Sequence, residues 1–456
     1  MTVELLVDGA ELVTTLDAED REIAGGWVAL RGGLVESVGG PFDERPAAER
    51  VLRADGCLVT PGLVNTHHHM YQNLTRAYRP TVNASLFTWL TTLYPLWAGL
   101  DEEAVHVSTW VGLAELALGG CTTTTDHLYV HPRGAGDLVS AEVAAAHELG
   151  MRFHPTRGSM SLSEKDGGLP PDSVVQDDDD ILADSERLVA LHHDRSWGAM
   201  VRVALAPCSP FSVSSDLMRR TAELAERLDV RLHTHLAEDP DEDRFAARTF
   251  GCRTVEHFED VGWMSERSWV AHCIYPDGGE VRRLGAAGVG VAHCPSSNML
   301  IGGGGTAPVA ELRAAGAPVG LGCDGSASTD HASLWLEART ALLLGHQRRG
   351  PTGMTARDVL DIATRGSAAC LGRAGELGTL TPGAVGDLVC WPLTGIRFAG
   401  ALTDPVEAWL RCGPLAPRHT VVAGRPVVED GALVRPGLED MLRRHHTIAS
   451  RLQRLV

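Results

Sequence analysis

Four side chains placed far apart in the chain have the chemistry of a metal site. His67 and His69 form a His-x-His pair after the apolar run Pro61–Val64, while His235 and Asp324 each follow strand-like runs much further along. Residues two apart on a strand point the same way, so both histidines of the pair can bind one cation. Three imidazoles and a carboxylate suit a divalent metal and leave a position open for water. The pattern predicts a hydrolase with one divalent ion, zinc first and ferrous iron as the alternative.

A hydrolytic site of this kind also needs groups that move protons. A bound divalent ion lowers the pKa of its water towards about 7, and Asp324 can accept a proton while it touches the metal. Glu238 comes three residues after His235, just beyond the strand, so its carboxyl group can carry a proton to a departing nitrogen. His272, at the end of another strand-like run, can hydrogen-bond the developing oxygen. We predict Glu238, His272 and Asp324 as catalytic residues, with His233, deeper in the strand of His235, as a group that supports the ligands.

The chain contains a single lysine, Lys165, in a Gly/Pro-rich loop. Barrel hydrolases with two metals often bridge them with a carboxylated lysine on the fourth strand. The run Val201–Ser209, which we predict to contain that strand, has no lysine. A single metal is therefore predicted, and the same absence argues against the hydrolysis of cyclic amides.

Eight short apolar runs alternate with helix-patterned stretches between about residues 57 and 372. The predicted strands are Cys57–Asn65, Gly120–Asp126, Arg152–Thr156, Val201–Ala206, Val230–His235, Trp269–His272, Val289–His293 and Pro318–Cys323. Eight strand–helix units in a row indicate parallel pairing and favour an α/β fold, a closed (β/α)8 TIM barrel. The active sites of such barrels lie at the carboxyl ends of the strands, where the whole predicted metal site falls.

Both flanks of this region show short alternating β patterns instead. Neither flank is large enough to bury a good core alone. We therefore expect a small β-sandwich built from residues 1–56 and 376–436, beside a catalytic barrel of residues 57–375. Residues 437–456 are predicted as a C-terminal helix.

The composition limits the class of protein and of partner. Of the 456 residues, 44% are hydrophobic, and no run reaches the roughly 18 apolar residues of a membrane helix. The net charge of −19 argues against binding to nucleic acid. Scattered cysteines without a Cys-x-x-Cys pair, and an N-terminus unlike a signal peptide, predict a cytoplasmic protein. We expect a small-molecule substrate and no nucleic-acid or membrane partner; a homo-oligomer would be common for this architecture.

These motifs resemble the amidohydrolase superfamily, in its branch of single-metal aminohydrolases. The matching stretches are Pro61–His69, His233–Glu238, His272, Cys294–Asn298 and Gly322–Ser326. The segments His67–Arg76 and Phe153–Met160 are most similar to the 8-oxoguanine deaminases. The resemblance implies the same four ligands and the same proton-handling groups. It also implies hydrolysis of the 2-amino group of 8-oxoguanine to give urate and ammonia.

Four residues near the motifs are candidates for binding a heterocyclic substrate. Gln72 can donate and accept at the edge of a purine, and Arg157 can hold a carbonyl group or an anionic ring. Asn298 follows the seventh strand and is expected to face the same opening. Trp97, like Trp89, lies in a long insertion where an aromatic lid can stack on a flat ring, although ordinary packing explains these tryptophans equally well.

Other substrates and one other class of protein remain as alternatives. Triazine chlorohydrolases look similar over the same length, but those that expel chloride can have threonine where this chain has Asp324. Deamination of guanine, isoguanine, cytosine or a triazine needs the same motif residues. A non-catalytic barrel that serves as a scaffold usually loses metal ligands, whereas this chain has the complete set.

Overall fold

The computed structural model describes residues 2–454. Its centre is a closed barrel of eight parallel strands in the order β10-β11-β12-β13-β14-β15-β16-β8. The strands are β8 (Leu63–Asn65), β10 (Cys121–Leu128), β11 (Arg152–Ser159), β12 (Ala204–Pro207), β13 (Leu232–Leu236), β14 (Ser268–His272), β15 (Gly290–His293) and β16 (Val319–Leu321). The barrel closes where Leu321 of β16 pairs with Asn65 of β8. The predicted (β/α)8 barrel is confirmed.

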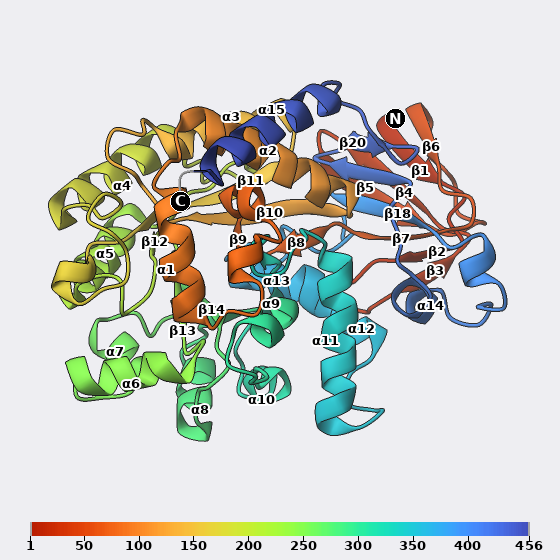
Figure 1. Ribbon diagram of the computed structural model, residues 1–456. Coiled ribbons are helices and arrows are strands. Elements are labelled where there is room, and N and C mark those ends of the chain that lie inside the picture. Colours follow the sequence, from red (N-terminus) through yellow and green to blue (C-terminus); the bar gives the residue numbers. More distant parts are fainter. Residues whose placement is uncertain (1, 455–456) are drawn as a thin grey trace.

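Amphipathic helices cover the outside of the barrel (Figure 1). They are α2 (Glu102–Leu118), α3 (Leu138–Leu149), α4 (Asp178–His192), α5 (Ser215–Leu228), α8 (Gly278–Ala286), α10 (Val309–Ala314) and α13 (Ser367–Cys370). Local sequence sets their ends: the Asp101 carboxylate accepts from the Ala104 N–H at the start of α2. Gly150 ends α3 in the left-handed conformation, at a φ of 73°, which glycine adopts without steric cost.

Longer connections follow the carboxyl ends of several strands. They contain β9 (His68–His69), η1 (Met70–Thr75), η2 (Arg79–Thr81), α1 (Leu86–Trp97), η3 (Glu164–Asp166), α6 (Pro240–Thr249), α7 (Thr254–Asp260), α9 (Pro295–Leu300), β17 (Asp324–Gly325), α11 (Leu334–Arg349), α12 (Ala356–Asp361) and the π-helix η4 (Ile362–Gly366). Two of these short strands, β9 and β17, pair in parallel, with Asp324 opposite His68 and Gly325 opposite His69. This pairing brings two regions more than 250 residues apart to one point above the barrel.

The two ends of the chain together form two further sheets beside the barrel, on the right of Figure 1. One has the order β5-β4-β1-β6 and the other β21-β20-β19-β18-β7-β2-β3. Their strands are β1 (Val3–Asp8), β2 (Leu12–Thr14), β3 (Glu22–Ala24), β4 (Trp27–Arg31), β5 (Leu34–Gly39), β6 (Ala48–Arg53), β7 (Cys57–Pro61), β18 (Leu388–Pro392), β19 (His419–Val422), β20 (Arg425–Glu429) and β21 (Ala432–Leu433). Two short helices, η5 (Ile396–Phe398) and α14 (Pro405–Arg411), follow β18.

The predicted first barrel strand, Cys57–Asn65, is two strands in the structure. Cys57–Pro61 is β7, which pairs with β18 and β2 in the seven-stranded sheet, and only Leu63–Asn65 enters the barrel. Gly62 stands at the break, where an added Cβ would lie 2.0 Å from the Thr122 hydroxyl oxygen. The expected domain boundary at residue 57 was therefore wrong by about one strand, because a continuous apolar run does not reveal which sheet covers it.

The last helix, α15 (Leu438–Leu452), packs along α2 and is seen in dark blue in Figure 1. Ile448 and Leu452 are buried against the insertion that follows the first barrel strand. Arg451 forms an ion pair with Asp101 at 2.7 Å. Residues 1, 455 and 456 of the predicted segments lie outside the described residues. Among residues 2–454, no helix combines the length and apolar character needed to cross a membrane.

Candidate active site

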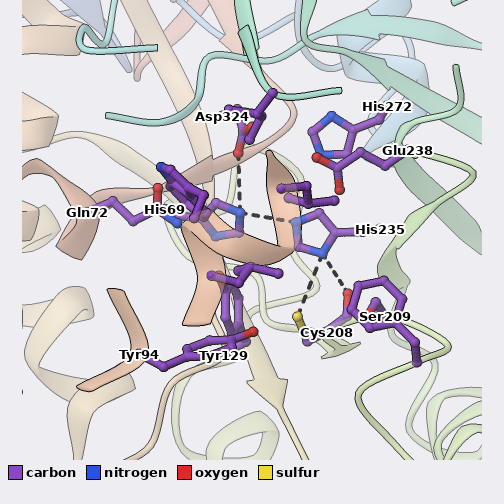
Figure 2. A pocket seen from close by; sticks show the side chains of 15 residues that line it. His69, Gln72, Tyr94, Tyr129, Cys208, Ser209, His235, Glu238, His272 and Asp324 are labelled. Atoms are coloured by element: carbon purple, nitrogen blue, oxygen red, sulfur yellow. Dashed lines mark hydrogen bonds and ion pairs between the residues drawn. The ribbon is translucent and has the colours of Figure 1, made fainter. Parts of the chain in front are cut away.

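Three of the four predicted ligands, His69, His235 and Asp324, converge above the carboxyl end of the barrel in Figure 2, and the fourth, His67, lies beside them. The Nε2 atoms of His67 and His69 each lie 3.3 Å from the Asp324 Oδ1 atom. The Nε2 atoms of His69 and His235 are 3.1 Å apart. All four side chains are buried, so their polar atoms face one another and not water.

The other ring nitrogen of each histidine is held by a hydrogen bond. His69 Nδ1 donates to the His127 carbonyl at 2.7 Å, and His235 Nδ1 donates to the Cys208 carbonyl at 2.6 Å. His67 Nδ1 lies 2.8 Å from His233 Nε2. The structure thus places His233 behind a predicted ligand, where the sequence had suggested a supporting group.

These bonds decide which nitrogens are free to bind a metal. A ring nitrogen that donates to a carbonyl carries the proton, so the Nε2 atoms of His69 and His235 present lone pairs. Two lone pairs 3.1 Å apart repel unless a cation lies between them. His67 Nε2 is buried without a hydrogen-bond partner, which fits the same position. The residues therefore suit one divalent ion held by three imidazoles and one carboxylate.

Asp324 is held in place through the carboxylate oxygen that does not face the histidines. Its Oδ2 atom accepts hydrogen bonds from Ser297 and, at 3.2 Å, from Ser328. Burial alone would raise the pKa of Asp324, but His67, whose Nε2 atom lies 3.3 Å away, and the other nearby imidazoles hold that pKa well below its usual range. The carboxylate is therefore ionised at neutral pH, as a metal ligand requires.

Glu238 and His272 form a second group at the mouth of the same site (Figure 2). His272 Nε2 lies 3.6 Å from Glu238 Oε1, and His272 Nδ1 lies 2.9 Å from the Asn298 amide oxygen. Burial raises the pKa of the Glu238 carboxyl to about 7, while the charge of His272 opposes that rise. A carboxyl group with such a pKa can both take up and release a proton near neutral pH.

The backbone that carries Glu238 is fixed by a second buried acid, Glu242 in α6. Its two carboxyl oxygens accept the N–H groups of Ala237 at 3.0 Å and Glu238 at 2.9 Å. Ala237 has a φ of 52°, a conformation that costs a residue with a Cβ about 1 kcal/mol or more. The Glu242 carboxyl group stabilises this turn.

A pocket opens over the metal ligands and is walled mainly by aromatic and apolar side chains. Its lining residues are His69, Gln72, Leu86, Trp89, Leu90, Tyr94, Tyr129, Cys208, Ser209, Phe211, His235, Glu238, His272, Ile301 and Asp324. Gln72 is buried, and its Oε1 atom has no hydrogen-bond partner in the protein. A flat ring with polar edges matches a cavity of this character.

The structure does not bring three of the predicted substrate-binding residues to the pocket wall. Arg157 points outward and bonds Asp184 and Gln176 at 2.8 and 2.9 Å. Trp97 is fully buried and bonds the Thr75 hydroxyl, so packing explains it, and Trp89 takes the lining position. Asn298 reaches the site only through His272.

Comparison with known proteins places the chain in a family. The pattern of the amidohydrolase family matches residues 58–427. The chain is 50% identical over 436 residues to 8-oxoguanine deaminase from Pseudomonas aeruginosa, covering 95% of this chain and 96% of the relative. The chain belongs to the amidohydrolase family. It is an enzyme, a hydrolase acting on C–N bonds, as the sequence resemblance implied.

Two further relatives extend the comparison within the amidohydrolases. Hydroxydechloroatrazine ethylaminohydrolase from a Pseudomonas species is 38% identical over 399 residues, covering 86% of this chain and 82% of the relative. The crystal structure of atrazine chlorohydrolase from Arthrobacter aurescens, complexed with zinc, superimposes with a TM-score of 0.93 at 32% identity. That comparison covers 98% of this chain and all of the other.

Sequence reasoning missed one histidine of this amidohydrolase site. His127, at the end of β10, lies with His67, His69 and His235 in a group whose donor atoms are all within 4.8 Å. Its Nε2 atom bonds the Ala206 carbonyl at 2.9 Å, and its Nδ1 atom is buried without a partner. The predicted strand stopped at Asp126, one residue short. The sequence did contain a signal for it, because Asp126 and His127 form a polar pair at the carboxyl end of a barrel strand.

Proposed function

We propose that the enzyme is a zinc-dependent deaminase that converts 8-oxoguanine and water to urate and ammonia. The observation that carries the proposal is the close approach of His67, His69, His235 and Asp324 beside the Glu238–His272 pair, whose atoms are 3.6 Å apart. The relative that shares half of its residues over 95% of the chain supports this substrate. The zinc-bound chlorohydrolase of the same fold supports zinc.

Each polar residue of the site has a distinct part in the proposed reaction. His67, His69, His235 and Asp324 would hold the metal, whose Lewis acidity makes water a nucleophile at neutral pH. Asp324 takes a proton from the attacking water. Glu238, with its pKa of about 7, carries a proton to the leaving amine. With Nδ1 bonded to the Asn298 amide oxygen, His272 donates from Nε2 in its doubly protonated form, to the water oxygen that adds to the ring.

The pocket residues explain why a flat heterocycle would bind. Trp89, Tyr94 and Tyr129 offer ring faces and edges, and each aromatic contact of this kind is worth about 0.5–1.5 kcal/mol beyond burial. The unpartnered Gln72 Oε1 atom accepts an N–H group of the ring. Leaving this acceptor unpaired would cost a poorer substrate about 1–3 kcal/mol.

Release of chloride from a triazine is the second candidate. The chlorohydrolase with a TM-score of 0.93 is the observation that favours it. An amine must be protonated before it leaves, whereas chloride leaves as the anion. Glu238 supplies the proton that only the leaving amine needs, so deamination is preferred.

A screen of ammonia release tests the substrate. 8-Oxoguanine, guanine, isoguanine, cytosine and hydroxytriazines are compared at equal enzyme, and chloride release is followed with chlorotriazines. We expect kcat/KM for 8-oxoguanine to exceed that for guanine by at least about 100-fold. Equal turnover of guanine would contradict the assignment. Elemental analysis of the purified protein should give one zinc per chain.

The wider setting follows from the same proposal. We place the enzyme in the cytoplasm, because all ten cysteines are free thiols and eight of them are buried, as expected in a reducing compartment. Its partner is the small heterocyclic substrate. Assembly into a homo-oligomer stays a prediction. Light scattering of the purified protein tests it by measuring the molar mass in solution.

A further inference from the structure

A second pocket of about 240 Å³ lies at the opposite end of the barrel from the metal ligands. Its wall comes from the beginnings of β11 to β14, whereas the metal ligands follow the strand ends. Six basic or imidazole side chains line it: His154, His193, Arg195, Arg202, Arg231 and Arg267. Such a concentration is unexpected in a chain with a net charge of −19.

Carboxylates neutralise only part of this positive charge. Arg267 pairs with Asp229 at 3.1 Å, and Arg202 pairs with Glu376 at 3.1 Å. Within residues 2–454, no carboxylate oxygen lies within 4.0 Å of a guanidinium nitrogen of Arg231 or Arg195. Two positive charges at the pocket are therefore left without a counter-ion.

Arg231 is the less exposed of these two arginines. Its Nη2 atom donates to the carbonyl groups of Glu266 and Cys370, both at 2.8 Å, and its Nε atom is buried without a partner. Burial, together with the positive charge of Arg267, lowers the pKa of Arg231 to about 10, although Glu266 opposes this shift. Charged side chains removed from water are normally paired with an opposite charge, so this arginine lacks a partner that an anion would provide.

His154 gives an independent indication at the same place. Its side chain is 1% exposed, and neither ring nitrogen has a hydrogen-bond partner. One face of the ring lies near Trp269, with centroids 5.7 Å apart. A buried imidazole with two unpaired nitrogens is costly, and the N–H group it carries when neutral can donate to a ligand.

We propose that this pocket binds a phosphate-class oxyanion, either inorganic phosphate or the phosphate group of a nucleotide. Arg231 and Arg195 supply the positive charge, and His154 supplies a donor. The planar guanidinium group can present two parallel N–H bonds to two oxygens of such an anion. The site is separate from the metal centre and goes beyond the proposed deamination.

Isothermal titration of the zinc-loaded enzyme with inorganic phosphate, and separately with adenosine 5′-monophosphate, tests the proposal. Arg231→Met keeps the length of the side chain and removes its charge. Arg195→Met does the same at the exposed rim. Arg227→Met is the matched control, because that arginine lies on α5 with its side chain 62% exposed. We expect saturable binding by the wild type and by Arg227→Met, weakened at least about tenfold in Arg231→Met.

The outcomes separate this site from the metal centre. Phosphate bound at the metal would keep its affinity in Arg231→Met, and that result overturns the proposal, as does absence of saturable binding by the wild type. If Arg231→Met does not fold, Arg195→Met decides, with an expected loss of about threefold or more. Tighter binding of the nucleotide than of phosphate identifies a nucleotide site, and the reverse order identifies a site for the free ion.

Discussion

Glu238 is the residue on which the chemistry of the site depends most directly. It is buried beside His272 but lies outside the cluster of metal-binding atoms. Replacing Glu238 by glutamine keeps the shape and removes the exchangeable proton. We expect kcat to fall at least about 100-fold with one zinc retained per chain. Activity assays with elemental analysis measure both, and Glu226→Gln, an exposed acid on α5, should leave both unchanged. Loss of zinc from Glu238→Gln would instead make Glu238 a ligand.

Glu242 is a positioning residue that acts on the reaction only through Glu238. Its carboxyl oxygens accept two backbone N–H groups, those of Ala237 and Glu238. In Glu242→Gln, the amide NH2 faces one of these donors, so the turn shifts and Glu238 moves with it. We expect kcat to fall about tenfold with little change in KM or zinc content. A variant that lost activity only through unfolding would show a parallel drop in its thermal midpoint, which differential scanning fluorimetry detects.

Side-chain direction limited what could be predicted at the residue scale. The ligands were predictable because a ring nitrogen or carboxylate at the end of a barrel strand reaches one common opening. The prediction that Arg157 binds substrate was wrong, because its side chain points to the outer face of β11 and bonds Asp184. A shift of one residue along a strand moves a side chain to the other face, and nothing in the sequence fixes that register.

At the scale of elements, β10 and α3 meet through two buried acids. Asp126 and Glu142 are fully buried neighbours, and the Asp126 Oδ2 atom and both Glu142 carboxyl oxygens have no hydrogen-bond partner when both groups are ionised. Burial raises the pKa of both carboxyl groups above the usual range, and the charge of Asp126 raises that of Glu142 further. The folded protein therefore binds more protons than the unfolded chain above about pH 4, so the free energy of unfolding falls as the pH rises towards 7.

Glu142→Gln tests this contact between strand and helix. The glutamine amide can donate to the Asp126 carboxylate, and the substitution removes one titrating group. We expect the variant to lose less stability than the wild type between pH 5 and pH 8, by up to about 1.4 kcal/mol per pH unit over the affected range. Urea denaturation at several pH values measures the slope. Glu226→Gln serves again as control, and an unchanged slope in Glu142→Gln would contradict the argument.

The elements themselves were largely predictable, and the short pairings over the barrel were not. All eight barrel strands overlap the predicted runs, because each is a short segment buried on both faces that alternates with helical patterns. The two-residue strands β9 and β17 carry no periodic signal, yet their pairing sets Asp324 beside the His-x-His motif. Such contacts depend on the closed barrel, so local sequence cannot specify them.

At the scale of the whole molecule, the terminal sheets and the barrel share one buried ion pair. Arg152 opens β11 in the barrel, and Asp387 precedes β18 in the seven-stranded sheet. Both are buried, and the guanidinium group bonds both carboxylate oxygens, at 3.1 and 3.0 Å. Asp387 also accepts the Ala423 N–H at 2.7 Å. This ion pair therefore stabilises the contact between the terminal sheets and the barrel, in addition to apolar packing.

Asp387→Ala would leave the Arg152 charge buried without its partner. Breaking a buried pair from one side costs about 3–5 kcal/mol, so we expect the free energy of unfolding to fall by that amount. Urea titration followed by tryptophan fluorescence and by circular dichroism measures it, and coincident curves would show that sheets and barrel unfold together. Asp260→Ala is the matched control, because that side chain is exposed at the end of α7 and its replacement should change stability by less than about 0.5 kcal/mol. A loss below about 1 kcal/mol in Asp387→Ala would show that the junction depends on apolar contact and not on this pair.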